Sequence, residues 1–155
     1  MILRIRSEKD QIVNLYPKLK KAADETDLGL QTVYANHLVL KATGFLENSV
    51  RAILQEYCNR HANEQIGKFV AHKVSRLNSL STGKLETLFN SFEPTNWAKI
   101  SDLCTDEDIS SVDSIKTIRD DIAHGKTNGT GLLTVNRYFT GICNFVGHVE
   151  KIILP

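Results

Sequence analysis

The sequence predicts an all-α protein, folded as an antiparallel bundle of about five to six helices. Apolar residues recur at spacings of three and four along most of the 155-residue chain, which is the period of one helical face. Only three prolines occur, Pro17, Pro94 and the final Pro155, so long stretches can be helical. The expected connections are short, which favours antiparallel neighbours.

Composition predicts one domain over residues 1–155, long enough to bury a core. Lys and Arg total 19 and Asp and Glu total 18, so a general affinity for polyanions is not expected, although a local basic patch is. No apolar run reaches the ~20 residues of a membrane helix, and the first residues lack the apolar stretch of a signal peptide. Three widely spaced cysteines without a Cys-x-x-Cys motif argue against zinc and disulfides. We therefore expect a cytoplasmic protein without metal, cofactor or membrane contact.

The first three helices are expected over residues 8–27, 30–60 and 64–80. Pro17 lies inside the first, where it should kink the helix or mark a restart, and residues 1–28 are expected to be peripheral. The second helix carries a wide apolar stripe, which is typical of a helix that packs in a bundle. The residues of this stripe are Phe45, Leu46, Val50, Ile53, Leu54 and Tyr57.

Three helices are expected in the second half of the chain. A short one covers about 85–92. The next is capped by the hydroxyl of Ser110 or Ser111 and ends at Gly125, which suits the left-handed residue that terminates many helices. The last covers 132–153 and is apolar nearly all round, so it should lie at the centre of the bundle or at a subunit interface.

Residues 119–125 read Arg-Asp-Asp-Ile-Ala-His-Gly, at the end of the fifth of these helices. Arginine can hold a phosphate through two parallel hydrogen bonds, and histidine can move a proton near neutral pH. Together they suit cleavage of a phosphodiester, although a chain of this composition contains about 0.7 such spacings by chance. In the alternative interpretation, Arg119 and Asp120 are a solvated helix surface and His124 is a cap that the helix dipole favours.

The surroundings of Arg119 favour the functional interpretation. Ile115, Arg119 and Ile122 share one helical face, so Arg119 should be partly buried and need a partner. Glu47 borders the apolar stripe of the second helix and is the expected ion-pair partner, with a solvated glutamate as the alternative. Arg119 and His124 are about 140° apart around an ideal helix, so they converge only if the helix end frays or two copies meet.

The helix over 111–124, with Arg-Asp-x-x-x-His-Gly at its end, resembles the signature of HEPN domains. That signature is an arginine, a polar residue, and a histidine four to six residues beyond the arginine. A long helix with Phe-Leu-Glu-Asn at 45–48, an Asn-Trp element at 96–97 and the apolar last helix extend the resemblance to about residues 31–153. The arrangement is most similar to the RiboL-PSP-type HEPN subgroup.

The resemblance implies a HEPN-like bundle that forms a homodimer with the motifs of two subunits facing each other. It implies a metal-independent endoribonuclease, as a toxin or phage-defence effector, that leaves 2′,3′-cyclic phosphate and 5′-hydroxyl ends. Arg119 would hold the scissile phosphate, His124 would act as general acid or base, and Asp120 would orient either of them. Glu47 joins these as the fourth candidate residue of the catalytic site. RNA would be the substrate, and a cognate antitoxin would be a further partner.

One position departs from the family pattern. HEPN toxins silenced by a partner nucleotidyltransferase often carry a tyrosine two residues after the histidine, where this chain has Lys126. Control through a modified tyrosine is therefore not expected. We predict RNA contacts by Lys126 and by Lys68, Lys73 and Arg76, which lie in a segment, 65–85, without an acidic residue. A solvated helix face is the alternative for the last three.

Two other interpretations remain open. The first is a non-catalytic HEPN-like dimer that serves as an interaction module or binds RNA or a nucleotide without cutting it. The second is a helical accessory protein unrelated to HEPN domains, in which the motif arose by chance. Loss of His124 separates the first from the nuclease, since it should abolish cleavage if the residue is catalytic and weaken folding or dimerisation if it is structural.

Overall fold

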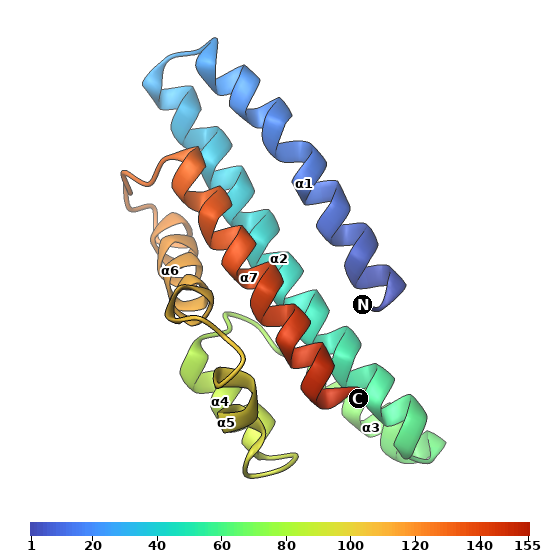
Figure 1. Cartoon of the computed structure of the whole chain (residues 1–155). Coiled ribbons are helices and arrows are strands. Elements are labelled where there is room, and N and C mark those ends of the chain that lie inside the picture. Colours follow the sequence, from blue (N-terminus) through green and yellow to red (C-terminus); the bar gives the residue numbers. More distant parts are fainter.

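Apolar residues at helical spacing along nearly the whole chain fold into helices and into no strand (Figure 1). The structure, a computed structural model, describes residues 1–155. The helices are α1 (Leu3–Asp24), α2 (Leu28–His61), α3 (Glu64–Val74), α4 (Thr82–Asn90), α5 (Asn96–Ser101), α6 (Asp106–Ala123) and α7 (Leu132–Ile153). The expected all-α bundle is confirmed, but it has seven helices and not five to six, because six residues around Trp97 form a separate helix, α5.

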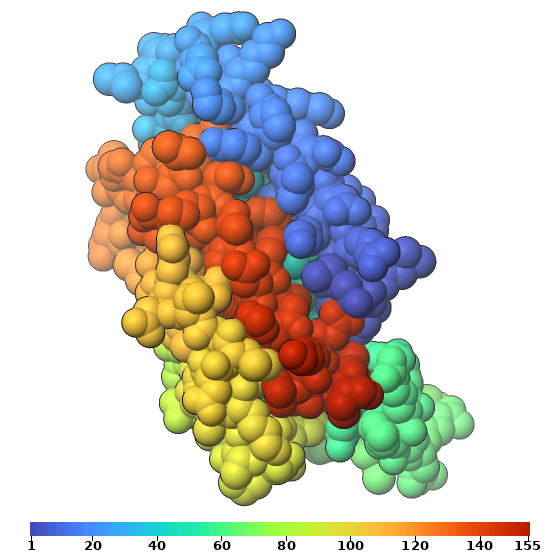
Figure 2. Space-filling view, in the orientation of Figure 1, coloured from blue at the N-terminus to red at the C-terminus, as the bar shows by residue number.

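The long helices α2 and α7 form the centre of the bundle. α1 lies along one side of this pair and α6 along the other (Figure 1). The space-filling view shows α1 against one flank of α7 and the segment around α5 and the start of α6 against the other (Figure 2). The neighbours α1 and α2 are antiparallel, as expected, and so are α6 and α7, but α2 and α7 run in the same direction (Figure 1). Short connections set the direction only of helices that are consecutive in the chain.

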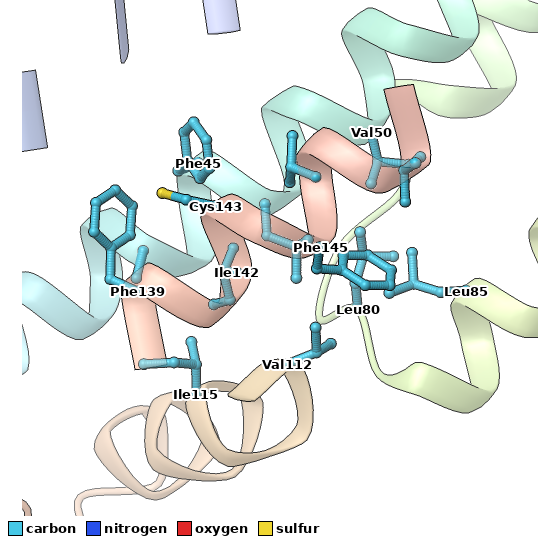
Figure 3. Packing of buried hydrophobic residues seen from close by; sticks show 14 of the residues in the cluster. Phe45, Val50, Leu80, Leu85, Val112, Ile115, Phe139, Ile142, Cys143 and Phe145 are labelled. Atoms are coloured by element: carbon cyan, nitrogen blue, oxygen red, sulfur yellow. The ribbon is translucent and has the colours of Figure 1, made fainter. Parts of the chain in front are cut away.

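The core lies where α2, α6 and α7 meet. Phe45 of α2 packs edge to face on Phe139 of α7, with ring centroids 5.4 Å apart, and Leu85 of α4 closes one end of the core beside Phe145 (Figure 3). α1 contributes a narrower stripe to the same core through its buried residues Ile5, Ile12 and Leu19. None of the seven helices is long and apolar enough to cross a membrane.

Several helix ends differ from the sequence predictions. α1 continues through Pro17 without a restart, since the carbonyl that loses its partner belongs to Val13, which is exposed to water. α3 ends at Val74, six residues before the predicted end at Leu80. If α3 continued to Leu80, the backbone of residues 75–81 could not make the contacts with α2 and α6 that are described below.

The N-terminus of α6 was also predicted wrongly. Its N-cap is Thr105, whose hydroxyl accepts the N–H of Asp108, while the Asp108 carboxylate accepts the N–H of Thr105. This reciprocal capping box satisfies two free N–H groups and extends the helix past the expected caps Ser110 and Ser111. Ser111 is instead fully buried against α7.

Gly141 allows the close approach of α7 to α6. A Cβ atom at this position would lie 2.4 Å from Ser111 Oγ and 3.3 Å from the carbonyl oxygen of Glu107. We expect Gly141→Ala to lower the free energy of unfolding by about 1–3 kcal/mol, because overpacking outweighs the better helix propensity of alanine. Urea unfolding followed by circular dichroism measures this difference.

Gly147 in the same helix is the matched control for this prediction. A Cβ atom there would meet nothing within 4 Å, so Gly147→Ala should leave the stability unchanged or raise it slightly. Equal effects of the two substitutions would show that the α6–α7 contact does not depend on a glycine.

Candidate functional site

The motif residues lie at the C-terminal end of α6. His124 is the C-cap of the helix, and Gly125 has a φ of +68°, the left-handed conformation that the sequence predicted for it. The N–H groups of Gly125 and Lys126 donate to the carbonyls of Ile122 and Asp121, so the helix end is closed and does not fray. The His124 side chain at this helix end is exposed.

Asp120 is the centre of the charged cluster on α6. Its carboxylate accepts hydrogen bonds from Lys116 Nζ at 2.5 Å and from Arg119 Nη1 at 3.2 Å. The hydrogen bond from Lys116, with further contributions from Arg119, holds the pKa of Asp120 below its ordinary value. Asp120 is therefore anionic at neutral pH, and it is the counter-charge that fixes the Arg119 guanidinium.

Arg119 is less buried than its position beside Ile115 and Ile122 suggested. Its side chain is 36% exposed, and a single hydrogen bond joins it to the rest of the chain. A guanidinium group has five N–H donors. The groups that Asp120 does not use are available to a ligand that approaches from solvent.

The sequence predicted an ion pair between Glu47 and Arg119, but Glu47 pairs with another residue. Its Oε2 lies 3.6 Å from Nη2 of Arg51, four residues further along α2, and its Oε1 accepts the N–H of Ser79 at 2.7 Å. Arg51 in turn donates to the carbonyls of Val74 and Leu77. A partner one turn away on the same helix costs little to hold in place, so Glu47 and Arg51 fasten the segment 75–81 to α2.

Ser79 connects these two groups of charges, and the sequence analysis missed it. Its N–H binds Glu47 of α2, and its hydroxyl donates to Asp120 of α6 at 3.4 Å. Its φ of +48° is unusual for a residue other than glycine. No spacing in the sequence relates positions 47, 79 and 120, so only the folded chain reveals this connection.

We expect Glu47→Ala to lower the free energy of unfolding by about 1–3 kcal/mol, because it leaves the Ser79 N–H without its acceptor and the Arg51 guanidinium without its counter-charge. Glu47→Gln keeps an oxygen acceptor for Ser79 and should lose less. Urea unfolding measures both values, and amide exchange over 75–81 should rise in the alanine variant. Identical stabilities of wild type and Glu47→Ala would contradict this positioning role.

His124 makes no side-chain contact with the other motif residues. Its backbone N–H donates to the carbonyl of Asp120 at 3.0 Å, but the Asp120 carboxylate is already bonded to Lys116, Arg119 and Ser79. Of the two residues that Asp120 was predicted to orient, Arg119 is hydrogen-bonded to its carboxylate and His124 is not. In one chain the arginine and the histidine are neighbours in position but are not joined by a hydrogen bond.

The residues predicted to bind RNA do not gather in one patch. Lys68 pairs with Glu64 at 2.5 Å, and Lys126 lies 3.7 Å from Asp121. Lys68, Lys73 and Arg76 belong to α3 and the turn after it, at the opposite end of the bundle from the loop that contains Lys126 (Figure 1).

The cysteines are unsuited to nucleophilic chemistry. Burial raises the pKa of Cys143 to about 12 and that of Cys104 to about 11. Burial likewise raises the pKa of Cys58. These thiols are protonated at neutral pH, and a thiol is a much weaker nucleophile than a thiolate. The chemistry of the candidate site therefore rests on the α6 residues.

Comparison with known proteins gave one match. The model of the RiboL-PSP-HEPN family matches residues 3–154. Neither the curated proteins nor the solved structures contain a match to the chain.

Proposed function

The chain belongs to the RiboL-PSP-HEPN family, and on this premise we propose that it is an endoribonuclease that cleaves RNA as a homodimer without a metal ion. The observation that carries the proposal is the end of α6. There a half-exposed Arg119 is fixed by an anionic Asp120, and an exposed His124 follows one turn later.

Arg119 is the phosphate-binding residue in this proposal. With one N–H bonded to Asp120, its remaining donors can hold two oxygens of the scissile phosphate. These hydrogen bonds strengthen as charge develops on the phosphate in the transition state. Lys116 also bonds to Asp120, so the carboxylate is held from both sides and keeps the guanidinium in place.

His124 is the proton-transfer residue. One histidine removes the proton of the 2′-hydroxyl as its oxygen forms a bond to phosphorus, and a second donates a proton to the 5′-oxygen as the P–O5′ bond breaks. The products are a 2′,3′-cyclic phosphate and a 5′-hydroxyl. A homodimer supplies the two histidines, and the lack of a contact between Arg119 and His124 within one chain favours a site that two copies complete.

Glu47 enters the proposal as a positioning residue. It holds Ser79 through the backbone, and Ser79 holds Asp120 through its hydroxyl.

We propose a role as toxin or phage-defence effector for the enzyme in the cytoplasm, with a cognate antitoxin as a further partner.

The test is incubation of the purified full-length protein with total RNA in excess EDTA. We expect fragments whose 3′ ends carry a cyclic phosphate and whose 5′ ends are accepted by polynucleotide kinase without prior dephosphorylation. Sedimentation equilibrium of the same sample should give the mass of a dimer. Intact RNA in the presence of a stable dimer would overturn the nuclease and favour a non-catalytic interaction or RNA-binding module.

A further inference from the structure

An exposed aromatic ring stands among cations on α3. Phe69 is 61% exposed, and His72 and Lys73 follow it at spacings of three and four residues, which places them on one face of α3. Arg76 lies in the turn after α3, with its guanidinium beside the His72 ring. We call these four residues the α3 face. A single exposed apolar side chain is ordinary on a protein surface, so what distinguishes Phe69 is the cationic side chains around it.

The cations of the α3 face have no acidic partner. Lys73 Nζ lies 5.4 Å from the centroid of the Phe69 ring, and Arg76 Nη2 lies 3.3 Å from Nε2 of His72. No Asp or Glu occurs between positions 65 and 85. The positive charge therefore faces solvent beside a flat aromatic surface, which is the combination that binds single-stranded nucleic acids through phosphates and stacked bases.

A groove begins beside Arg76 of the α3 face and also contains Lys84. It is an open groove of about 760 Å³ between the turn after α3 and α4. Lys84 Nζ donates to the carbonyls of Asn78 and Ser79 at 3.4 and 3.1 Å. Ser79 in turn bonds to Asp120, the partner of Arg119. Arg76 and Lys84 thus line one groove, and hydrogen bonds through Ser79 and Asp120 join Lys84 to Arg119.

We propose that the α3 face binds single-stranded RNA beside the cleavage site, with a base stacked on Phe69 and with Lys73 and Arg76 against neighbouring phosphates. The substrate then follows the groove past Lys84 to Arg119. The path of the RNA strand toward Arg119 rests on the proposed function, whereas binding of RNA to the α3 face does not require cleavage. An acidic protein could also pair with Lys73 and Arg76, but it has no base to stack on the Phe69 ring.

Binding is tested in full-length His124→Ala protein, which keeps the RNA intact, by the fluorescence anisotropy of a labelled single-stranded oligonucleotide of mixed sequence. We expect Phe69→Ala to weaken binding roughly 10-fold. Phe69→Leu should weaken it similarly, and Phe69→Tyr should restore it. Lys73→Ala and Arg76→Ala should each weaken binding and lower the slope of log K against log salt by about one. Lys99→Ala on α5, whose lysine pairs with Glu93, is the control and should bind like the parent.

Three outcomes decide the inference. Unchanged binding by the Phe69 and cation variants overturns it, even if the wild type cleaves RNA. Equal losses in Phe69→Ala for single-stranded and fully paired RNA also overturn it, because a paired base cannot stack on the ring. Loss of binding in Phe69→Ala and its recovery in Phe69→Tyr support it, even if the wild type proves inactive as a nuclease.

Discussion

On the proposed function, we expect His124→Ala to lower the rate of RNA cleavage by roughly 10²–10⁴-fold, the usual contribution of a general acid or base, and to leave the fold unchanged. The imidazole is exposed and forms no hydrogen bond or ion pair with another side chain, so its removal should cost little stability. Arg119→Ala should lose a similar factor. Arg119→Lys keeps the positive charge but not the two parallel hydrogen bonds, so it should recover little. Initial rates on a labelled RNA, with thermal melts of each variant, measure these effects.

His37 of α2 provides the matched control, since it is an exposed histidine in a pocket that contains none of the motif residues. His37→Ala should cleave like the wild type. An equal loss in both variants, or a His124→Ala protein that no longer folds, would contradict a catalytic role for His124.

Mixed dimers test whether two histidines serve one site. When wild type is diluted with His124→Ala protein and the subunits exchange, a composite site leaves only wild-type homodimers active. The activity should then fall with the square of the wild-type fraction. A linear fall would show that each subunit carries a complete site.

We expect Phe45→Ala to lower the free energy of unfolding by about 3–5 kcal/mol, the usual cost of removing a buried phenylalanine. The Phe45 ring is fully buried, and its edge-to-face contact with Phe139 joins the two central helices (Figure 3). The substitution removes this contact and leaves a cavity between α2 and α7. The expected loss is a large part of the free energy of unfolding of a typical domain, which is roughly 5–15 kcal/mol.

Urea unfolding at a fixed protein concentration measures this change, because the proposed dimer would make apparent stability depend on concentration. Leu133→Ala is the control, since that side chain is 72% exposed at the start of α7 and its loss should change stability by less than about 0.5 kcal/mol. A Phe45→Ala protein as stable as the Leu133→Ala protein would show that the α2–α7 contact contributes little to folding.

The basic residues show what the sequence alone can say about a charged surface. The stretch without acids, 65–85, was visible in the sequence, and the structure leaves Lys73 and Arg76 exposed. The exposed ring of Phe69 could not be predicted, because Phe69 belongs to an apolar pattern that resembles a core-facing stripe. Whether such a stripe is covered depends on where α3 ends and which helix lies over it.

Local patterns determined much of this protein. The apolar spacing predicted the bounds of α7 as residues 132–153, and Gly125 marked the end of α6 because few other residues adopt its backbone conformation. The motif at 119–124 carried the family assignment, which the match over residues 3–154 confirms. These properties depend on residues within a few turns of one another, so they can be read directly from the sequence.

Only the tertiary structure decided how distant segments meet. It made α2 and α7 parallel, gave Glu47 the partner Arg51 in place of Arg119, and inserted Ser79 between α2 and α6. It also ended α3 at Val74, because the backbone beyond that residue bonds to Arg51 and Glu47. Each of these contacts joins groups whose pairing energy depends on distance in space and not on separation along the chain. A periodic pattern carries no information about such distances.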